Sequence, residues 1–243
     1  MRIFEVDIAR GLGILLVVIY HIFYDLNYFG IANFEMDDGI LMVLGRLAAI
    51  ILIFVVGVSL VLSYSRAENE GKNTCLKFAK RAAYLFFVSA VISVATWIYP
   101  HNGWIFWGII QFIAFSVFAC HFFAKYFKLN FILGVAGILI GFYLQNFATE
   151  NVFLFILGVP ANIYTSDYFP VFPWIGIVFL GMFFSKAVYK KRVFEGKNLN
   201  SVFGLIKIPH LKILGIMGTN SLFIYLLHQP VLVGLILLIK AVF

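Results

Sequence analysis

Long apolar stretches follow one another along nearly the whole chain, and short polar segments separate them. A helix needs about 20 apolar residues to cross a bilayer core of about 30 Å, and about seven stretches are long enough. They cover residues 8–29, 40–64, 80–99, 104–124, 129–147, 171–189 and 214–239. Because backbone polar groups inside a bilayer must be bonded within the protein, we expect each stretch to be a helix. The pattern therefore predicts an all-α, polytopic transmembrane helix bundle of about seven spans, with residues 1–243 as a single domain.

Two local features refine this prediction. The apolar stretch 152–160 is too short to span and ends at Pro160, which predicts an interfacial or re-entrant segment. Gly134, Gly137 and Gly141 recur at helical spacing within the stretch 129–147. Small residues at that spacing let two membrane helices approach closely, so we interpret these glycines as packing positions.

Lysine and arginine residues concentrate in alternate polar segments, chiefly 2–10, 66–81, 125–128 and 186–212. Basic residues accumulate on the cytoplasmic side of membrane proteins, so these segments are predicted to be cytoplasmic. The intervening segments carry Glu35, Asp37, Asp38, Glu150 and Asp167. The N-terminus should therefore be cytoplasmic and the C-terminus external, as expected for a multi-pass protein of the cell membrane.

Composition supports the membrane assignment and excludes other classes. Hydrophobic residues make up 63% of the 243 residues, charged residues 12%, and the mean hydropathy is +1.01. A soluble domain of this length could not bury so much apolar surface, so the lipid bilayer is the expected environment. The net charge of +7 lies mostly in short loops between apolar stretches, which argues against a nucleic-acid partner. Cys75 and Cys120 show no disulfide framework and no zinc-site spacing, and we expect no metal.

Ionisable residues form a stripe along the first apolar stretch. At about 100° per residue, Arg10 and His21 lie within roughly 20° of each other on one helix face. Asp7 and Asp25 fall on the same face. Ionisable groups inside a membrane are costly and normally face protein or a water-filled cavity, so the stripe predicts a functional site.

His21 is the leading catalytic candidate, because a histidine can accept a proton near neutral pH. Asp25, one helical turn further along, is placed to orient the ring. The alternative interpretation is a hydrogen-bonded core histidine with a structural carboxylate. Asp7 and Arg10 have a spacing that also suits an ion pair at the helix end.

Three groups of residues carry a resemblance to a known family. The opening joins Asp7-Ile8-Ala9-Arg10-Gly11 to His21 and Asp25-Leu26-Asn27, the segment 166–170 is followed by Pro173-Trp174, and the segment 218–222 leads to His228. In order and spacing they resemble the heparan-alpha-glucosaminide N-acetyltransferase catalytic-domain family in its small prokaryotic form, within the transmembrane acyltransferases. The lysosomal members use a histidine in the loop after the first span, whereas residues 28–39 contain none, which leaves His21.

The resemblance implies a membrane acyltransferase. It would move an acetyl group from cytoplasmic acetyl-CoA to a hydroxyl or amine of a sugar or glycan at the outer side. His21 would act as general base, and Arg10 could meet the phosphates of coenzyme A, because arginine binds phosphate with paired hydrogen bonds. The larger members of the family have more spans, so a homodimer is one way in which this short chain could complete its cavity.

The last apolar stretch supplies further candidates. Ser221, Tyr225 and His228 share one helix face, since seven residues make nearly two turns. His228 is either a second catalytic histidine facing the same cavity as His21 or a structural residue that bonds a neighbouring helix. By resemblance, Asn220 and Ser221 are candidates for cofactor binding, and Asn220 could instead cap a turn.

Three residues are candidates for substrate binding. Asp167 and Trp174 belong to a proline-containing outer segment whose aromatic residues also suit a membrane-interface belt. Arg46 lies inside the second apolar stretch and needs a partner there. The carboxylates nearest in depth are Asp25, Asp37 and Asp38.

A transporter or proton-relay protein is the alternative function, because an intramembrane histidine–aspartate stripe with an arginine would also serve proton transfer. Transporters often contain repeated halves with broken helices. The sequence has no evident repeat, which favours the acyltransferase.

Overall fold

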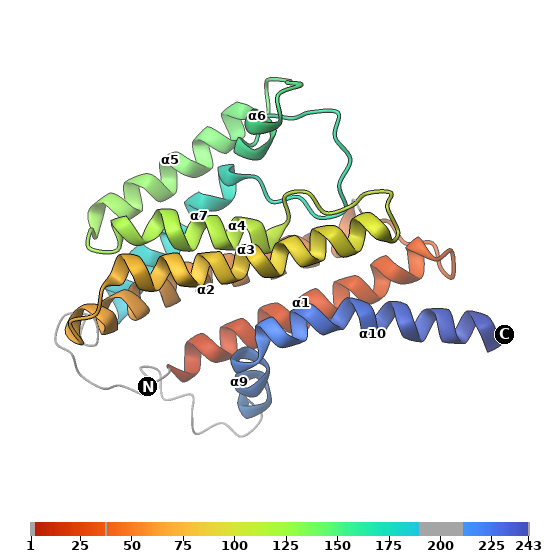
Figure 1. Cartoon of the computed structure of the whole chain (residues 1–243), viewed down its shortest axis with the longest axis horizontal. Helices are drawn as coiled ribbons and strands as arrows, with labels where there is room; N and C mark the ends of the chain where they lie inside the picture. Colours follow the sequence, from red (N-terminus) through yellow and green to blue (C-terminus); the bar gives the residue numbers. More distant parts are fainter. Residues whose placement is uncertain (1–2, 37, 190–210, 243) are drawn as a thin grey trace. The chain divides into compact units, whose positions relative to one another are not determined.

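A computed structural model describes residues 3–36, 38–189 and 211–242 (Figure 1). Within these residues, regular structure is helical apart from one isolated β-bridge between Trp107 and Tyr168. The helices are α1 (Phe4–Tyr28), α2 (Gly39–Asn69), α3 (Thr74–Ile98), α4 (Ile109–Cys120), the 3-10 helix η1 (His121–Phe123), α5 (Lys128–Leu144), α6 (Val152–Leu157), α7 (Val171–Val188), α9 (Leu211–Thr219) and α10 (Ser221–Val242). The predicted all-α class is therefore confirmed for the described part of the chain.

Among the described residues, five helices are long and apolar enough to cross a membrane: α1, α2, α3, α7 and α10. The predicted spans 104–124 and 129–147 correspond to shorter apolar helices, Ile109–Phe123 and Lys128–Leu144. The first of these begins late because residues just before Ile109 are extended and pair with the chain at Tyr168. The membrane protein is confirmed, and the count of about seven spans stays a prediction.

The last predicted span, 214–239, is wrong at its start. The structure divides it at Asn220 into α9 and α10. Two side chains, those of Thr219 and Asn220, donate hydrogen bonds of 2.8 and 2.9 Å to the carbonyl of Ile216. These bonds occupy a carbonyl in the last turn of α9 and end that helix.

The chain forms two compact units, which are described separately. The first unit contains residues 1–55 and 198–243, and the second contains residues 56–197. Helix α2 contributes its first part to one unit and its second part to the other. The expectation of a single domain over residues 1–243 stays a prediction.

In the first unit, α1 packs against both α9 and α10. Helices α1 and α10 run side by side in the same direction (Figure 1), and Lys240 near the end of α10 donates to the carbonyl of Phe29 just after α1. Ile14, Val17 and Ala48 form the buried apolar core beneath them. Two helices with the same direction finish on the same side of a membrane, which supports the prediction that the C-terminus lies opposite the N-terminus.

Two glycines let the backbones of α1 and α9 touch. A Cβ atom added to Gly11 would overlap the carbonyl of Leu214, and one added to Gly218 would overlap the carbonyl of Asp7. Close approach of this kind requires small residues at the crossing. The crossing brings the first turns of α1, including Arg10, to the junction between α9 and α10.

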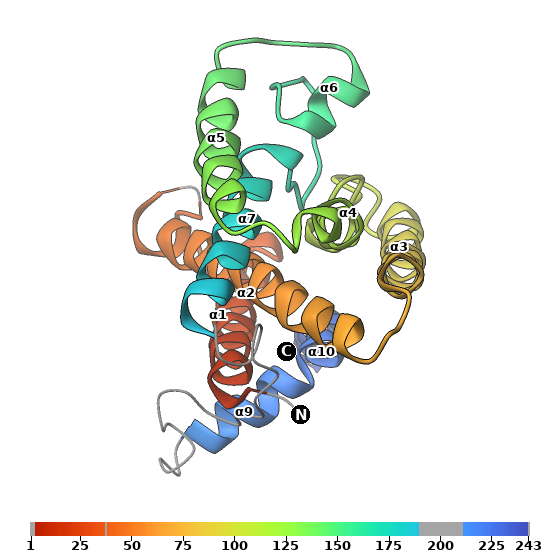
Figure 2. The ribbon, with the colours of Figure 1, turned by 90° about the vertical axis from the view of Figure 1, so that its left-hand side faces the viewer.

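In the second unit, α5 packs along α7 and α3 packs along α4 (Figure 2). The packing role predicted for the glycines of α5 is confirmed, because a Cβ at Gly137 would lie 3.0 Å from Gly176 and one at Gly141 2.5 Å from Pro173. Helix α6 has only six residues, as expected for the short stretch 152–160. Its ability to lie at an interface stays a prediction.

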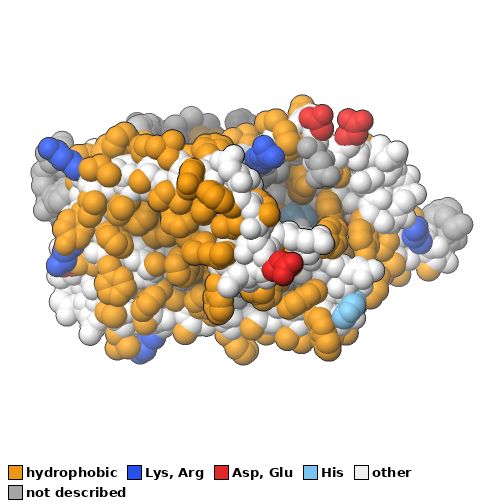
Figure 3. All heavy atoms as spheres, turned by 90° about the horizontal axis from the view of Figure 1, so that it is seen from above, with side chains coloured by type: hydrophobic (Ala, Val, Ile, Leu, Met, Phe, Trp, Pro, Cys, Tyr) orange, Lys and Arg blue, Asp and Glu red, His pale blue; other side chains and the backbone are white. Residues whose placement is uncertain are grey.

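Large hydrophobic side chains cover much of the molecular surface. Figure 3 shows a face on which hydrophobic side chains predominate and charged groups are few. Exposed members of this set include Ile40, Phe87, Phe142, Phe153 and Leu238. A surface of this kind is unfavourable in water and suits lipid contact.

Candidate active site

The ionisable residues of α1 lie on one helix face, as the helical periodicity predicts, and the structure shows that this face contacts α9 and α10. Asp7 and Asp25 are buried, and Arg10 and His21 are half-buried. Arg10 contacts the carbonyl of Gly218 at the end of α9, while His21 and Asp25 contact residues of α10. The stripe is therefore the face through which α1 meets the C-terminal helices.

His21 and His228 form a ring pair at the centre of this face. Their ring centroids are 4.8 Å apart and their planes meet at 79°. Nδ1 of His21 lies 2.8 Å from the carbonyl of Val17, and Nδ1 of His228 lies 2.5 Å from the carbonyl of Tyr225. A carbonyl oxygen can only accept, so each Nδ1 carries a proton. In the neutral rings both Nε2 atoms consequently hold a lone pair and can accept a proton.

Asp25 is bonded differently from the sequence prediction. Nε2 of Gln229 donates to Oδ1 of Asp25 at 3.4 Å, and the ring of His21 is oriented by the Val17 carbonyl. The reason is local, because a histidine inside a helix can donate back to the carbonyl four residues earlier. The Asp25 side chain is then available to the neighbouring α10.

Gln229 is a site residue that the sequence analysis missed. It follows His228 directly and precedes Pro230 in a predominantly apolar helix. A polar side chain at such a position is a signal for function, and Gln229 could have been found by that rule. Its partner could not, because the contact with Asp25 depends on how α1 and α10 pair.

Three buried atoms around this pair have no hydrogen-bond partner within the described ranges: Oδ2 of Asp25, Nε2 of His228 and Oε1 of Gln229. Each is an acceptor when Asp25 is ionised and His228 is neutral. Buried acceptors without donors cost free energy, so this lining is suited to a group that brings hydrogen-bond donors. An amine or a hydroxyl is such a group.

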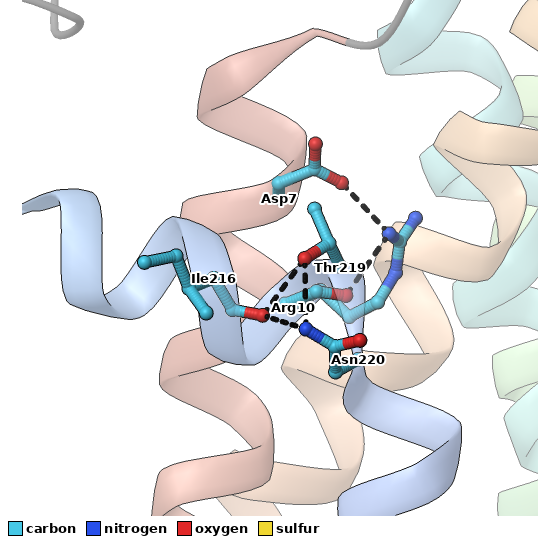
Figure 4. Close-up of polar contacts among 6 residues, drawn as sticks. Asp7, Arg10, Ile216, Thr219 and Asn220 are labelled. Carbon is cyan, nitrogen blue, oxygen red and sulfur yellow. Dashed lines mark hydrogen bonds and ion pairs between the residues drawn. The ribbon is translucent and has the colours of Figure 1, made fainter.

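Two of the predicted cofactor residues, Arg10 and Asn220, lie in a second polar cluster in the first unit (Figure 4). Arg10 forms an ion pair with Asp7 at 2.9 Å, so the predicted pair is confirmed, and Arg10 also donates to the carbonyl of Gly218 at 3.4 Å. The exposed Asn220 donates to the carbonyl of Ile216, which is the turn-capping role left open by the sequence. Ser221 is the first residue of α10.

Asp167 caps a helix in the second unit. Its Oδ2 accepts a 3.0 Å hydrogen bond from the backbone N–H of Ile109, at the start of α4. Burial raises the pKa of the Asp167 carboxyl to about 6, against the opposing effect of this hydrogen bond. A Cβ added to Gly108 would overlap this carboxylate, so a larger residue there would displace the Asp167 side chain. The predicted substrate role of Asp167 stays a prediction.

Trp174, in the first turn of α7, packs on Phe169 with ring centroids 4.9 Å apart. The backbone N–H of Phe169 in turn donates to the carbonyl of Trp107, in the loop before α4, at 3.0 Å. Trp174 thus belongs to the same loop cluster as Asp167. Its contact with a substrate stays a prediction.

The expected carboxylate partner of Arg46 is not found. Arg46 is exposed on α2 and forms no ion pair with any residue that the structure describes. Asp25 is bonded to Gln229, and Asp38 accepts from the backbone N–H of Gly39. Asp37 lies outside the described residues. A substrate-binding role for Arg46 stays a prediction.

The described ranges contain no group of three or more histidine, cysteine, aspartate or glutamate side chains that could hold a metal ion. The expectation that the protein uses no metal stays a prediction.

Comparison with known proteins identifies a family. The family model for the catalytic region of heparan-alpha-glucosaminide N-acetyltransferase matches residues 2–230. No curated protein and no solved structure matches the chain. The matched range includes the polar stripe of α1, the α9–α10 junction and His228. The chain therefore belongs to the heparan-alpha-glucosaminide N-acetyltransferase catalytic family, and this membership implies a membrane acetyltransferase with acetyl-CoA as donor.

Proposed function

We propose that this protein transfers an acetyl group from cytoplasmic acetyl-CoA to an amine or hydroxyl of a sugar or glycan that reaches the site from the outer side. The observation that carries the proposal is the His21–His228 pair, in which both Nε2 atoms can accept a proton. Family membership supports the donor and the reaction type.

His21 is proposed as the general base. The acceptor nucleophile must lose a proton as its bond to the acetyl carbon forms and the carbon–sulfur bond breaks. Nε2 of His21 takes that proton, and the departing thiolate of coenzyme A is protonated in turn. The carboxylate of Asp25, one turn away on α1, favours the positive charge that develops on the histidine pair. Each proton and electron pair is accounted for without a further reactant.

The lining of unpartnered acceptors favours an amine over a hydroxyl. An ammonium group brings three donors and a positive charge, whereas a hydroxyl brings one donor. Asp25, His228 and Gln229 offer one unpartnered acceptor each. A bound ammonium must be deprotonated before it can attack, and two neutral histidines in contact can supply that step.

The cluster at the α9–α10 junction is proposed to hold the phosphate end of the donor. Arg10 supplies a guanidinium, and α10 begins there with backbone N–H groups at the positive end of its dipole. Thr219 and Asn220 are exposed beside it. Phosphate groups are recognised by this combination of charge and oriented N–H donors.

The test is acetyl transfer by the purified full-length protein in lipid vesicles, with acetyl-CoA and either glucosamine or a sugar that has only hydroxyl groups. Free coenzyme A thiol and acetylated sugar are measured together. We expect both products in equal amounts, more with glucosamine. His101→Ala is the matched control for a substitution of His21, because the ring of His101 also bonds a helical carbonyl but is exposed in a loop. Proton movement across the vesicle without acetylated product would instead support the proton-relay alternative.

A further inference from the structure

Gln229 joins the two helices that carry the histidine pair. Its Nε2 donates to Oδ1 of Asp25, and no other donor to the Asp25 carboxylate is found within the described ranges. Asp25 is almost completely buried, with 3% relative exposure of the residue. A carboxylate at such a position depends strongly on each hydrogen bond it receives.

This hydrogen bond also decides which oxygen of Asp25 is available. Oδ1 is engaged by Gln229, and Oδ2 is left buried without a partner. If the bond is lost, the carboxylate can rotate and either oxygen can turn away from the site. The remaining Oε1 of Gln229 is itself a buried acceptor without a donor. Gln229 therefore fixes one acceptor and contributes another.

The hydrogen bond between Asp25 and Gln229 lies next to the two proposed catalytic histidines. Gln229 is the neighbour of His228 on α10, and Asp25 lies one turn beyond His21 on α1. The Asp25–Gln229 contact thus holds α1 to α10 beside the ring pair. A shift of the order of 1 Å between reacting groups can reduce a rate by about 100-fold.

We propose that Gln229 is a positioning residue for acetyl transfer, which acts by holding the Asp25 carboxylate and the His21–His228 pair in register. This inference rests on the proposed function. It assigns to Gln229 a role in kcat, since the donor-binding cluster lies at the other end of the α1–α10 contact, around Arg10.

The primary test is Gln229→Met in the full-length protein, because methionine has a similar length and cannot donate. We expect kcat to fall by about 10-fold to 100-fold while the KM for acetyl-CoA is unchanged. Gln229→Asn keeps the amide but is one methylene short of Asp25, so we expect a similar loss. This second variant keeps the polarity of the site if Gln229→Met does not fold.

Two controls separate positioning from a general structural effect. Gln145→Met removes another side-chain amide donor, which bonds the carbonyl of Gly158 in the second unit, and should leave kcat unchanged. In an Asp25→Ala background, Gln229→Met should have little further effect on kcat, because residues that act through one contact are not additive.

The outcomes are distinct. A parent protein that forms no acetylated product overturns the proposed function itself. An active parent with folded Gln229→Met and Gln229→Asn variants of unchanged kcat overturns only the role of Gln229. Fully additive effects of Gln229→Met and Asp25→Ala overturn the proposed route through Asp25.

Discussion

His21 and His228 meet with their ring centroids 4.8 Å apart, although they lie 207 positions apart in the sequence. Each ring donates from Nδ1 to a carbonyl of its own helix, so the helices themselves fix the two tautomers. The contact arises because α1 and α10 run in the same direction and pack together. Two proton acceptors are thereby placed side by side in a buried setting, which is the basis of the first prediction.

We predict that His21→Ala abolishes acetyl transfer without abolishing donor binding. Loss of a general base typically reduces the rate by about 10²-fold to 10⁴-fold. Donor binding should survive because Arg10 contacts Gly218 and Asp7, away from the ring pair. Transfer and acetyl-CoA binding are to be measured separately, with His228→Ala in parallel. Normal transfer by His21→Ala and none by His228→Ala would assign the base to His228, and normal transfer by both would make the pair structural.

The polar stripe of α1 could be predicted because it depends only on helical periodicity. Arg10, His21 and Asp25 lie on one face in any regular helix, and membrane insertion requires that face to be covered. The ion pair of Arg10 with Asp7 could be predicted for the same reason. The residues that cover the stripe could not be predicted from the local sequence of α1. The contact with Gln229 follows from the pairing of distant helices.

Other differences have equally specific causes. The hydropathy of the last stretch continues through Asn220, so the break between α9 and α10 depends on side-chain hydrogen bonds to Ile216. The hydrogen bond that Asp167 accepts from the N–H of Ile109, at the start of α4, joins segments far apart in the sequence and could not be predicted, while its substrate role stays a prediction. The predicted partner of Arg46 was chosen by depth alone, and depth does not determine which helix face a side chain occupies.

We predict that Gly218→Ala destabilises the first unit. The new methyl group would overlap the backbone of Asp7, and overpacking of this kind typically costs about 1–3 kcal/mol. Gly234→Ala is the matched control, because a Cβ at Gly234 has no neighbour within 4 Å and alanine favours a helix by up to about 1 kcal/mol. Thermal unfolding of both variants in the same detergent should show a lower midpoint for Gly218→Ala only. Equal midpoints would contradict the close α1–α9 crossing.

We predict that Arg10 contributes to donor binding. The test variant is the double substitution Asp7→Asn with Arg10→Gln, which removes both charges of the ion pair and avoids an orphaned carboxylate. The KM for acetyl-CoA should rise by about 10-fold, as expected for loss of a charge-assisted contact with phosphate. Lys212→Gln, an exposed cation on α9, is the control and should leave KM unchanged. An unchanged KM in the double variant would remove Arg10 from the donor site.

We predict that Asp167 makes the protein less stable as pH rises between about 4 and 6. Burial raises the pKa of its carboxyl from 3.8 to about 6. The folded state therefore keeps a proton that the unfolded state releases, so stability falls through this window and is level above it. Thermal unfolding midpoints across this range are to be compared between the parent and Asp167→Asn. The parent should lose more stability than the variant as pH rises, and parallel curves would contradict the prediction.

The final prediction concerns the membrane side of each end of the chain. Helices α1 and α10 begin at the same end of the first unit, so if both span, their last residues emerge on the same side. The basic segments predict that their first residues are cytoplasmic. A cysteine added after residue 243 should therefore react with an impermeant maleimide in intact cells. The native Cys75 is an internal control, because it is exposed in the segment 66–81, predicted to be cytoplasmic, and should react only after permeabilisation. Cys75→Ser removes that signal and isolates the added cysteine. Reaction of Cys75 in intact cells, with the added cysteine protected, would reverse the orientation and move the donor cluster around Arg10 to the outer side.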